Sequence, residues 1–285
     1  MTLRIEDIEA NGLTFKCRRD GPDDGDLVVL LHGFPETSRM WLPLIERLAA
    51  EGYQVLAPDQ RGYSPGARPA EEAAYAYANL VEDLFSLVDA VGGDRFHLVA
   101  HDHGAGVGWA ASATRPERLA SYVAMSVPHV TAFSQAIAED EDQQQRSQYI
   151  SFFRQPGGVA EQALSADDFA GLRNVWSESD EAEVADYLDV FRQEGALTGA
   201  LNWYRNLNEP GGGVALEVGE ITTPTLLIWG NGDSAIGRRG VELGEGYMKG
   251  PYRLAELDAG HWLIQQEPER VTKEVLAHLE AYPIA

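Results

Sequence analysis

An aspartate stands in this chain where a turn between a strand and a helix could expose it as a nucleophile. The apolar run Phe96–Ala100 ends at His101-Asp102-His103-Gly104, and small residues in a helical pattern follow. A strand, a sharp turn and a helix form the setting of a nucleophile elbow, in which a strained turn lifts one side chain above a parallel sheet. A carboxylate at the centre of this turn, Asp102, would attack an alkyl carbon and form an ester. Aspartate is also a favoured helix N-cap, so the turn alone leaves a structural role for Asp102 equally open.

Two further ionisable residues follow apolar runs later in the chain. Asp233 stands in the turn after Thr225–Trp229, and His261 follows Tyr252–Leu257. Alone, Asp233 could be a turn former and His261 a structural histidine. Because catalytic groups of open α/β sheets gather at the carboxyl ends of strands, we expect both residues to meet Asp102. His261, oriented by Asp233, would then activate water against the ester on Asp102.

Two backbone N–H groups are expected to stabilise the oxyanion that forms when water attacks this ester. One belongs to His103, directly after the nucleophile, and the other to Phe34, in the loop after Leu27–Leu31. Adjacent side chains diverge in a tight turn, so we expect those of His101 and His103 to line or support the pocket. We expect His32 to support the loop that holds Phe34.

Strands that alternate with helices must position these residues. Strands are expected at residues 27–31, 53–57, 96–100, 119–125, 225–229 and 252–257, after a hairpin at residues 3–19 that turns at Asn11-Gly12. Helices are expected between Trp41 and Gly52, at residues 75–91, after the nucleophile turn and at residues 268–282. This alternation is typical of an α/β fold with a mostly parallel central sheet and helices on both faces.

The alternation of strands and helices stops after Pro128. From His129 to about Asn208 the segment shows amphipathic helical patterns and no convincing strand, and Gly211-Gly212-Gly213 predicts a flexible exit. We therefore expect a core domain of residues 1–128 and 214–285 and an all-helical cap of residues 129–213. The acidic, glutamine-rich tract Glu139–Gln145 is expected to be a solvated helix face or a mobile loop.

Composition limits the classes of protein and partner. The 285 residues are 44% apolar and carry a net charge of −23, so nucleic acids and anionic membranes would be repelled. The single cysteine, Cys17, excludes an internal disulfide and fits the cytoplasm. We find no apolar run of signal-peptide length or of the roughly 18 residues that a membrane span needs. The expected chemistry requires no cofactor and no metal, and the sequence leaves a homodimer open.

Four motifs resemble those of the α/β-hydrolase-fold epoxide hydrolases. They are His32-Gly33-Phe34-Pro35-Glu36, Asp59-Gln60-Arg61-Gly62-Tyr63, His101-Asp102-His103-Gly104 and Gly260-His261-Trp262. The order nucleophile, acid, histidine is also that of α/β hydrolases. The resemblance covers nearly the whole chain and implies that water is added to a small apolar epoxide to give a vicinal diol.

Two segments of the expected cap extend the resemblance. Gln148–Gly157 and Leu201–Asn206 look like the two cap-tyrosine segments of the family. By this resemblance, Tyr149 and Tyr204 would hydrogen-bond the epoxide oxygen and help to open the ring. A tyrosine with its usual pKa near 10 is protonated at neutral pH and can donate to a developing alkoxide. A packing role is the alternative for each tyrosine.

Three aromatic or cyclic side chains, Pro35, Trp203 and Trp262, are also expected to line the substrate pocket. His103 stands where epoxide hydrolases often carry a tryptophan, which would make one pocket wall more polar. Some relatives place the acid after the strand that ends near Met125. This chain has Ser126-Val127-Pro128 there, which leaves Asp233 as the acid.

Two other functions stay open. A haloalkane or haloacid dehalogenase would use the same aspartate nucleophile and the same ester hydrolysis. Haloalkane relatives typically carry a donor such as asparagine where this chain has Phe34, and haloacid relatives carry arginines where His103-Gly104-Ala105 follow the nucleophile. Both differences favour the epoxide. A non-catalytic small-molecule-binding protein with the same fold is the second alternative, because fold alone does not prove function.

Overall fold

The computed structural model describes residues 3–207 and 218–284 of the chain and contains one eight-stranded sheet. The strands are β1 (Arg4–Ala10), β2 (Leu13–Asp20), β3 (Leu27–Leu31), β4 (Gln54–Pro58), β5 (Phe96–His101), β6 (Leu119–Met125), β7 (Thr225–Gly230) and β8 (Tyr252–Leu257). Their order is β1-β2-β4-β3-β5-β6-β7-β8. The pairs β1–β2 and β2–β4 are antiparallel and the other pairs are parallel, which confirms the predicted mostly parallel sheet.

Local sequence explains most of these strands. All residues of β3, β5, β6 and β7 are buried, as expected of parallel strands covered on both faces. The β1–β2 hairpin turns at Asn11 and Gly12, which both have positive φ, as a two-residue turn between antiparallel strands requires.

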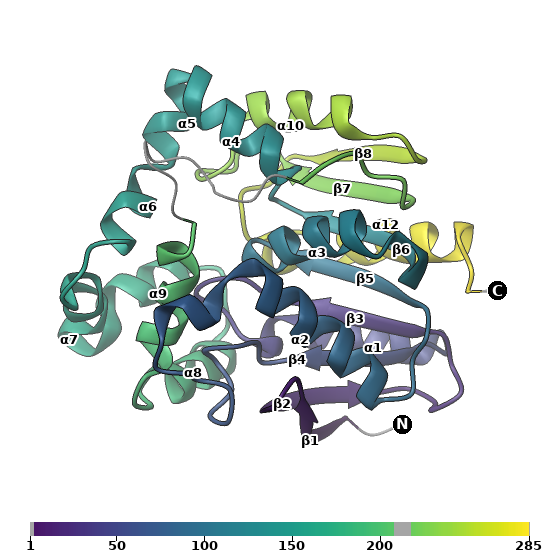
Figure 1. Cartoon of the computed structure of the whole chain (residues 1–285), viewed down its shortest axis with the longest axis horizontal. Helices are drawn as coiled ribbons and strands as arrows, with labels where there is room; N and C mark the ends of the chain where they lie inside the picture. Colours follow the sequence, from purple (N-terminus) through teal and green to yellow (C-terminus); the bar gives the residue numbers. More distant parts are fainter. Residues whose placement is uncertain (1–2, 208–217, 285) are drawn as a thin grey trace.

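Helices cover both faces of the sheet, as predicted (Figure 1). Helices α2 (Tyr77–Ala90) and α3 (His103–Thr114) contact each other on one side, and α1 (Leu42–Ala50) and α12 (Pro268–Ala281) contact each other on the other. Helix α2 begins two residues later than predicted, because Glu72–Tyr75 forms a separate 3-10 turn. Two further short helices, α10 (Arg238–Gly244) and α11 (Leu263–Gln266), were not predicted from the sequence.

The insertion between β6 and β7 is helical, as predicted, in the part that the structure describes. It contains α4 (Val130–Glu139), α5 (Glu141–Arg146), α6 (Gln148–Phe153), α7 (Val159–Val175), α8 (Glu181–Phe191) and α9 (Ala196–Arg205). Helix α4 packs beside α10, whereas α6 to α9 gather at the left of the molecule in Figure 1. The predicted exit at Gly211-Gly212-Gly213 lies outside the described residues.

The prediction for the acidic tract is wrong at one position. Glu141–Arg146 forms helix α5, and its acidic residues are exposed, but Gln143 is completely buried. Its side chain hydrogen-bonds Ser147, the carbonyl of Ala235 and the N–H of Gly237. Helix α5 therefore packs on the loop after β7 through the buried side chain of Gln143.

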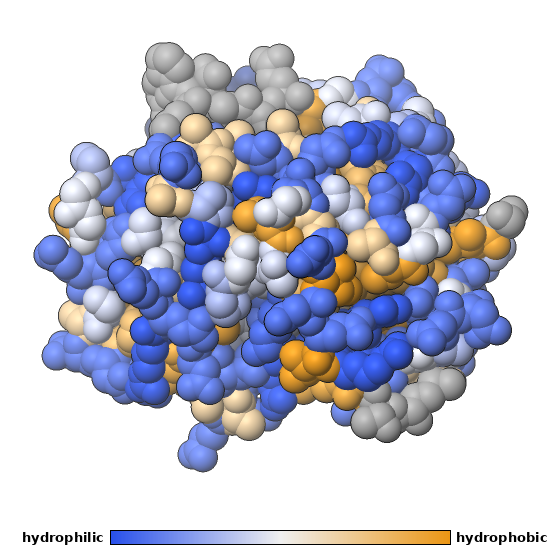
Figure 2. Space-filling model, turned by 60° about the horizontal axis from the view of Figure 1, so that its bottom comes forward, coloured by the Kyte–Doolittle hydropathy of each residue, from blue (hydrophilic) through white to orange (hydrophobic). Residues whose placement is uncertain are grey.

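The face of the molecule drawn in Figure 2 is predominantly hydrophilic. On the face shown in Figure 2, hydrophobic residues form only limited patches among hydrophilic ones. No helix within the described ranges is long and apolar enough to cross a membrane.

Candidate active site

Asp102 lies in the turn between β5 and α3 with φ 52° and ψ −120°. Positive φ is strained for a residue with a side chain, and such strain concentrates at functional turns. The side chain makes no capping hydrogen bond to α3. Instead, Oδ1 accepts a hydrogen bond of 2.9 Å from the N–H of Phe34. The N-cap alternative for Asp102 is therefore wrong, and the carboxylate faces the loop after β3.

His261 lies between two carboxylates. Its Nδ1 is 2.7 Å from Asp233 Oδ2, and its Nε2 is 3.5 Å from Asp102 Oδ2. The other oxygen of Asp233 accepts hydrogen bonds from the N–H groups of Ala235 and Ile236. Three residues from three strand ends, which the sequence places far apart, thus form one chain of polar contacts.

The pKa values of His261 and Asp102 depend on each other, because each side chain stabilises the charged form of the other. Burial disfavours the imidazolium, but the charge of Asp233 and the contacts with both carboxylates outweigh it and raise the pKa of His261 to about 10. Burial alone would also raise the pKa of Asp102, but the contact with His261 and the neighbouring histidines lower it below its usual range. At neutral pH, Asp102 is therefore a carboxylate and the neighbouring His261 is an imidazolium.

The backbone carbonyl of His261 is held from two sides. Ser126, at the alternative acid position, donates its hydroxyl to this carbonyl at 2.8 Å. His101 Nε2 is 3.0 Å from the same oxygen, and it carries a hydrogen there because a carbonyl can only accept. His101 therefore lies behind His261, in the supporting position expected of it, and Ser126 positions the histidine instead of supplying an acid.

The loop of Asp233 is held by a helix that sequence reasoning did not connect with the site. Gln143 of α5 bonds Ala235 and Gly237, and Arg146 of the same helix donates to the carbonyl of Asp233. The spacing of Gln143 and Arg146 places them on one helix face, which is a weak signal in a polar tract.

The loop after β3 approaches the nucleophile closely. A Cβ atom on Gly33 would lie 2.3 Å from Asp102 Oδ1, so only glycine fits there. His32 is buried, with Nδ1 3.0 Å from the carbonyl of Gly33 and Nε2 accepting from the N–H of Gln60, as expected of a loop support. The N–H of His103 is the first of α3 and has no partner within that helix. Together with Phe34, it is available to an oxyanion.

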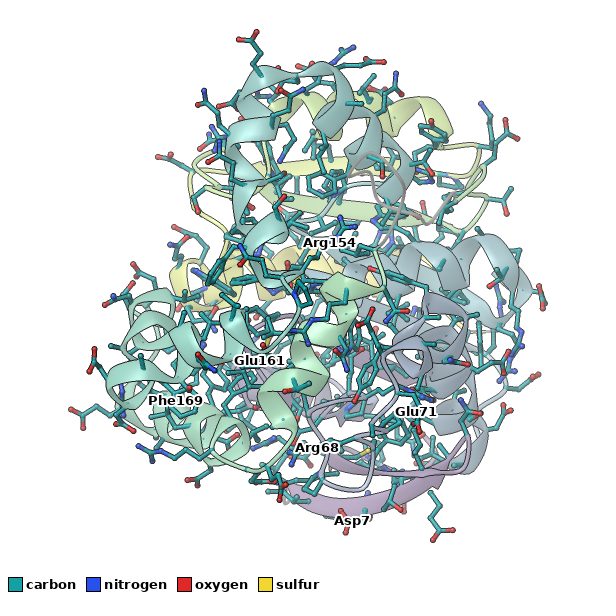
Figure 3. The ribbon with its side chains drawn as sticks, turned by 60° about the vertical axis from the view of Figure 1, so that its left-hand side comes forward. Asp7, Arg68, Glu71, Arg154, Glu161 and Phe169 are labelled. Carbon is teal, nitrogen blue, oxygen red and sulfur yellow. The ribbon has the colours of Figure 1, made fainter. Side chains whose placement is uncertain are left out.

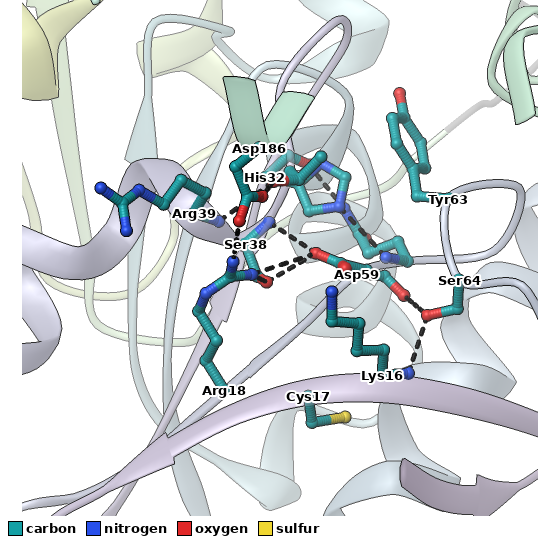
Figure 4. A network of polar contacts seen from close by, with 12 residues as sticks. Lys16, Cys17, Arg18, His32, Ser38, Arg39, Asp59, Tyr63, Ser64 and Asp186 are labelled. Carbon is teal, nitrogen blue, oxygen red and sulfur yellow. Dashed lines mark hydrogen bonds and ion pairs between the residues drawn. The ribbon is translucent and has the colours of Figure 1, made fainter. Parts of the chain in front are cut away.

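A network of buried polar contacts underlies this loop (Figure 4). Ser38 donates from its N–H and its hydroxyl to one oxygen of Asp59, at 2.9 and 2.6 Å. Arg18 of β2 lies 3.6 Å from the same oxygen and 2.6 Å from Asp186 of helix α8 in the insertion. The network therefore links strand β2, the loop after β3 and the helical insertion.

Two cavities meet at Asp102, Tyr149 and Tyr204, which line both of them. The larger, of about 380 Å³, is also lined by His261, Phe34, Pro35 and Trp262. The smaller, of about 40 Å³, is also lined by Tyr77, His103 and a set of apolar side chains. The structure therefore brings both predicted tyrosines, Pro35, Trp262 and the side chain of His103 around the nucleophile.

Trp203 lies behind the cavity wall. It lines neither cavity at Asp102, its ring packs edge-to-face on His103, and its indole N–H donates to the carbonyl of Arg61 at 2.8 Å. The expectation that Trp203 would line the pocket fails because this hydrogen bond turns the indole toward the core.

Close packing of α9 on the core sets the position of Tyr204. A Cβ on Gly62 would lie 2.7 Å from the backbone of Gly199, so two glycines let loop and helix touch. Nearby, Arg68 donates to the carbonyl of Glu194. Figure 3 shows Arg68 and Glu71 beside α9, with Glu161 of α7 on the other side. Arg205, at the end of α9, pairs with this Glu161 at 2.9 Å.

The two tyrosines are phenols rather than phenolates. Their ring centroids are 6.1 Å apart. Burial, and then the charge of Asp102, raises the pKa of Tyr149 and of Tyr204 above its usual range. Both hydroxyls can therefore donate to an oxygen that gains negative charge. Among residues 3–207 and 218–284, no group of three or more His, Cys, Asp or Glu side chains could hold a metal ion.

Comparison with known proteins agrees with this architecture. A family model described as "alpha/beta hydrolase fold" matches residues 26–268. The AB hydrolase superfamily protein YfhM of Bacillus subtilis is 31% identical, over 98% of both chains. Epoxide hydrolase A of Mycobacterium tuberculosis is 32% identical, over 95% of this chain and 96% of its own.

Solved structures extend the similarity. Epoxide hydrolase A from Mycobacterium thermoresistibile covers 100% of both chains at 30% identity, with a TM-score of 0.86. A variant of an epoxide hydrolase from Bacillus megaterium, in complex with its product (R)-3-[1]naphthyloxy-propane-1,2-diol, covers 96% of this chain and 100% of its own at 26% identity, with a TM-score of 0.88. The chain therefore belongs to the α/β-hydrolase-fold family, as a hydrolase of the epoxide hydrolase group.

Proposed function

We propose that this protein hydrolyses small apolar epoxides to vicinal diols through an ester on Asp102. The observation that carries the proposal is that Tyr149 and Tyr204 line both cavities together with Asp102. A carboxylate nucleophile that faces two phenol donors suits a three-membered ring, whose oxygen must be stabilised as it leaves carbon. Relatives about 30% identical that are named epoxide hydrolases support the same chemistry.

In the first step, Asp102 attacks a ring carbon and forms a C–O bond. The electron pair of the broken ring bond goes to the epoxide oxygen, to which Tyr149 and Tyr204 donate hydrogen bonds. Esterification removes the charge of one of the two carboxylates that hold the proton of His261. The pKa of His261 therefore falls, and its proton passes to the alkoxide, which becomes the first hydroxyl group of the product.

In the second step, neutral His261 takes a proton from water, and the water oxygen attacks the ester carbonyl. The N–H groups of Phe34 and His103 stabilise the oxyanion. Cleavage of the ester bond releases the diol and regenerates the Asp102 carboxylate and the imidazolium. One carboxylate oxygen then comes from water.

We infer that residues 129–213 act as the cap of a core formed by residues 1–128 and 214–285. The described part of the insertion supplies both tyrosines, through α6 and α9, while the core supplies the triad. In this division, the insertion supplies the donors to the epoxide oxygen, and the core supplies the nucleophile and the groups that hydrolyse the ester.

The first experiment gives the purified protein an aryl epoxide and a bromoalkane and quantifies diol and bromide. Diol without bromide is the expected result. Bromide without diol would show a dehalogenase and make the tyrosines packing residues. Tight binding without either product would identify a binding protein.

Variants test the assigned roles. With His261→Gln, we expect the ester on Asp102 to form and persist, so that intact mass increases by one substrate; Asp102→Asn gains no mass. Tyr204→Phe should lower the alkylation rate roughly 100-fold or more, as does removal of one donor to a developing oxyanion. Tyr252→Phe, in β8 and outside both cavities, is the matched control. An unchanged rate in Tyr204→Phe would contradict the role of the cap.

A further inference from the structure

The smaller cavity contains two polar groups that the proposed reaction does not use. Tyr77, at the start of α2, and the imidazole of His103 both line it, and neither lines the larger cavity. In the described part of the chain, neither side chain has a hydrogen-bond partner. The rest of this wall is largely apolar, with Val127, Val130, Phe133, Ile150, Leu207 and Ile236. Two unpaired polar groups in an apolar cavity point to a polar ligand atom.

The two groups lie next to each other on one face of α3. A Cβ on Gly106 would lie 2.5 Å from the hydroxyl oxygen of Tyr77, so this hydroxyl rests over Gly106. Gly106 follows His103 by three residues and therefore shares its helix face. The ring of His103 packs edge-to-face on Tyr204 and on Trp203, with centroids 4.3 and 5.5 Å apart. Both groups are thus held in place beside the nucleophile.

Their protonation selects the kind of ligand. Burial raises the pKa of Tyr77 above its usual range and lowers the pKa of His103, so the phenol is protonated and the imidazole neutral. Together they offer donors and an acceptor but no charge. The nearby charge of Asp102 disfavours an anion. These properties match a neutral hydroxyl group, which both donates and accepts.

The volume of the smaller cavity limits the size of the group that it can bind. The cavity of about 40 Å³ is a few times larger than the roughly 10–15 Å³ that one water molecule needs. It therefore has room for a substituent of about two heavy atoms. The larger cavity, of about 380 Å³, remains for the bulky part of the substrate.

We propose that the smaller cavity binds a hydroxymethyl group on the epoxide ring, with Tyr77 and His103 as its hydrogen-bond partners. The preferred substrates are then epoxy alcohols with a larger apolar group on the other ring carbon. This assignment rests on the proposed epoxide hydrolysis. It makes Tyr77 and the His103 side chain specificity-determining residues.

The test compares two epoxides of the same shape, trans-3-phenyl-2,3-epoxypropan-1-ol and trans-1-phenyl-1,2-epoxybutane, which differ only in a hydroxyl against a methyl group. We expect kcat/KM of the wild-type protein to favour the alcohol roughly tenfold. Tyr77→Phe and His103→Phe should each reduce this preference roughly three- to tenfold, and His103→Gln, which keeps a donor and an acceptor, should retain most of it. Tyr75→Phe is the matched control, because its buried hydroxyl donates to the carbonyl of Pro69 outside both cavities.

The outcomes separate this assignment from the proposed function. Diol from both compounds at equal kcat/KM, or a preference that survives both phenylalanine variants, would overturn the hydroxymethyl site and leave epoxide hydrolysis intact. Such a result would assign the smaller cavity to water. Absence of diol from both compounds and from simple aryl epoxides would overturn the proposed function, and the assignment with it.

Discussion

At the scale of single residues, the site depends on one imidazole between two carboxylates. His261 contacts Asp233 at 2.7 Å and Asp102 at 3.5 Å, and all three side chains are buried. In the proposed cycle, one histidine holds a proton while Asp102 is charged and becomes a base when Asp102 is esterified. The change of role needs no movement of the ring, because a neighbouring charge controls the pKa.

The raised pKa of His261 predicts a pH dependence of stability. Its pKa is about 10 in the folded protein and about 6.5 when unfolded, so its contribution is complete below pH 6.5 and is lost as the pH rises through 10. The difference in unfolding free energy between wild type and His261→Gln should therefore shrink toward pH 10, by at most about 1.4 kcal/mol per pH unit. Urea unfolding of both proteins across this window measures it. Parallel curves would contradict the raised pKa.

A second prediction concerns the glycine beside the nucleophile. In Gly33→Ala, the added Cβ would lie 2.3 Å from Asp102 Oδ1, so the carboxylate or the oxyanion loop must move. We expect kcat/KM for an epoxide to fall roughly 100-fold or more, because a small misplacement of reacting groups is costly. Gly246→Ala, whose Cβ would meet nothing within 4 Å, is the control. Equal activity of the two variants would show that the loop at Gly33 can shift without displacing Asp102.

At the scale of elements, an ion pair that is buried on the side of Arg18 joins the helical insertion to the sheet. Arg18 of β2 is 2% exposed and lies 2.6 Å from Asp186 of α8, and Thr37 donates to the same carboxylate at 3.1 Å. Figure 4 shows this carboxylate above Arg18. Helix α8 is thereby held against the loop after β3, which contains Phe34.

We expect Asp186→Asn to weaken this attachment. The substitution leaves the buried Arg18 with less compensation, and because Asp186 is 24% exposed the loss should be about 1–3 kcal/mol. Urea unfolding gives the free energy, and hydrogen exchange within α8 shows where protection is lost. Asp23→Asn breaks the exposed Arg4–Asp23 pair, which solvent screens, and should therefore cost less than Asp186→Asn. Equal losses would mean that Asp186 does not fasten the cap.

At the scale of the whole molecule, the large negative net charge affects both stability and the approach of ligands. The chain has 45 acidic and 22 basic residues, and its net charge is −23. Repulsion among these charges disfavours the compact state, and added salt screens it. Substrates without charge can approach such a surface, whereas anions are repelled.

Raising NaCl from about 0.05 to about 0.5 M should therefore increase Tm by roughly 2–6 °C. Differential scanning calorimetry measures the shift. KCl should have the same effect as NaCl, because screening depends on ionic strength and not on the cation. A Tm that stays constant or falls would show that attractive ion pairs outweigh the repulsion.

Local sequence predicts much of the fold and the placement of Asp102, Asp233 and His261. Strands such as β3 and β6 were predicted with their observed bounds, because an apolar run between turn residues specifies a buried strand without reference to distant residues. The positions of Asp102, Asp233 and His261 at strand ends are local in the same sense. Once parallel strands assemble, their carboxyl ends meet at one edge, so the sequence already implied that these residues approach each other.

Contacts between distant segments could not be obtained in this way. The burial of Gln143, the orientation of Trp203 and the place of Tyr77 beside His103 depend on how α5, α9 and α2 pack on the core. That packing is set by side-chain volume and by close approaches such as Gly62 against Gly199. No periodicity along the chain encodes such pairs, because a residue's partner across a packed interface is chosen by shape in three dimensions.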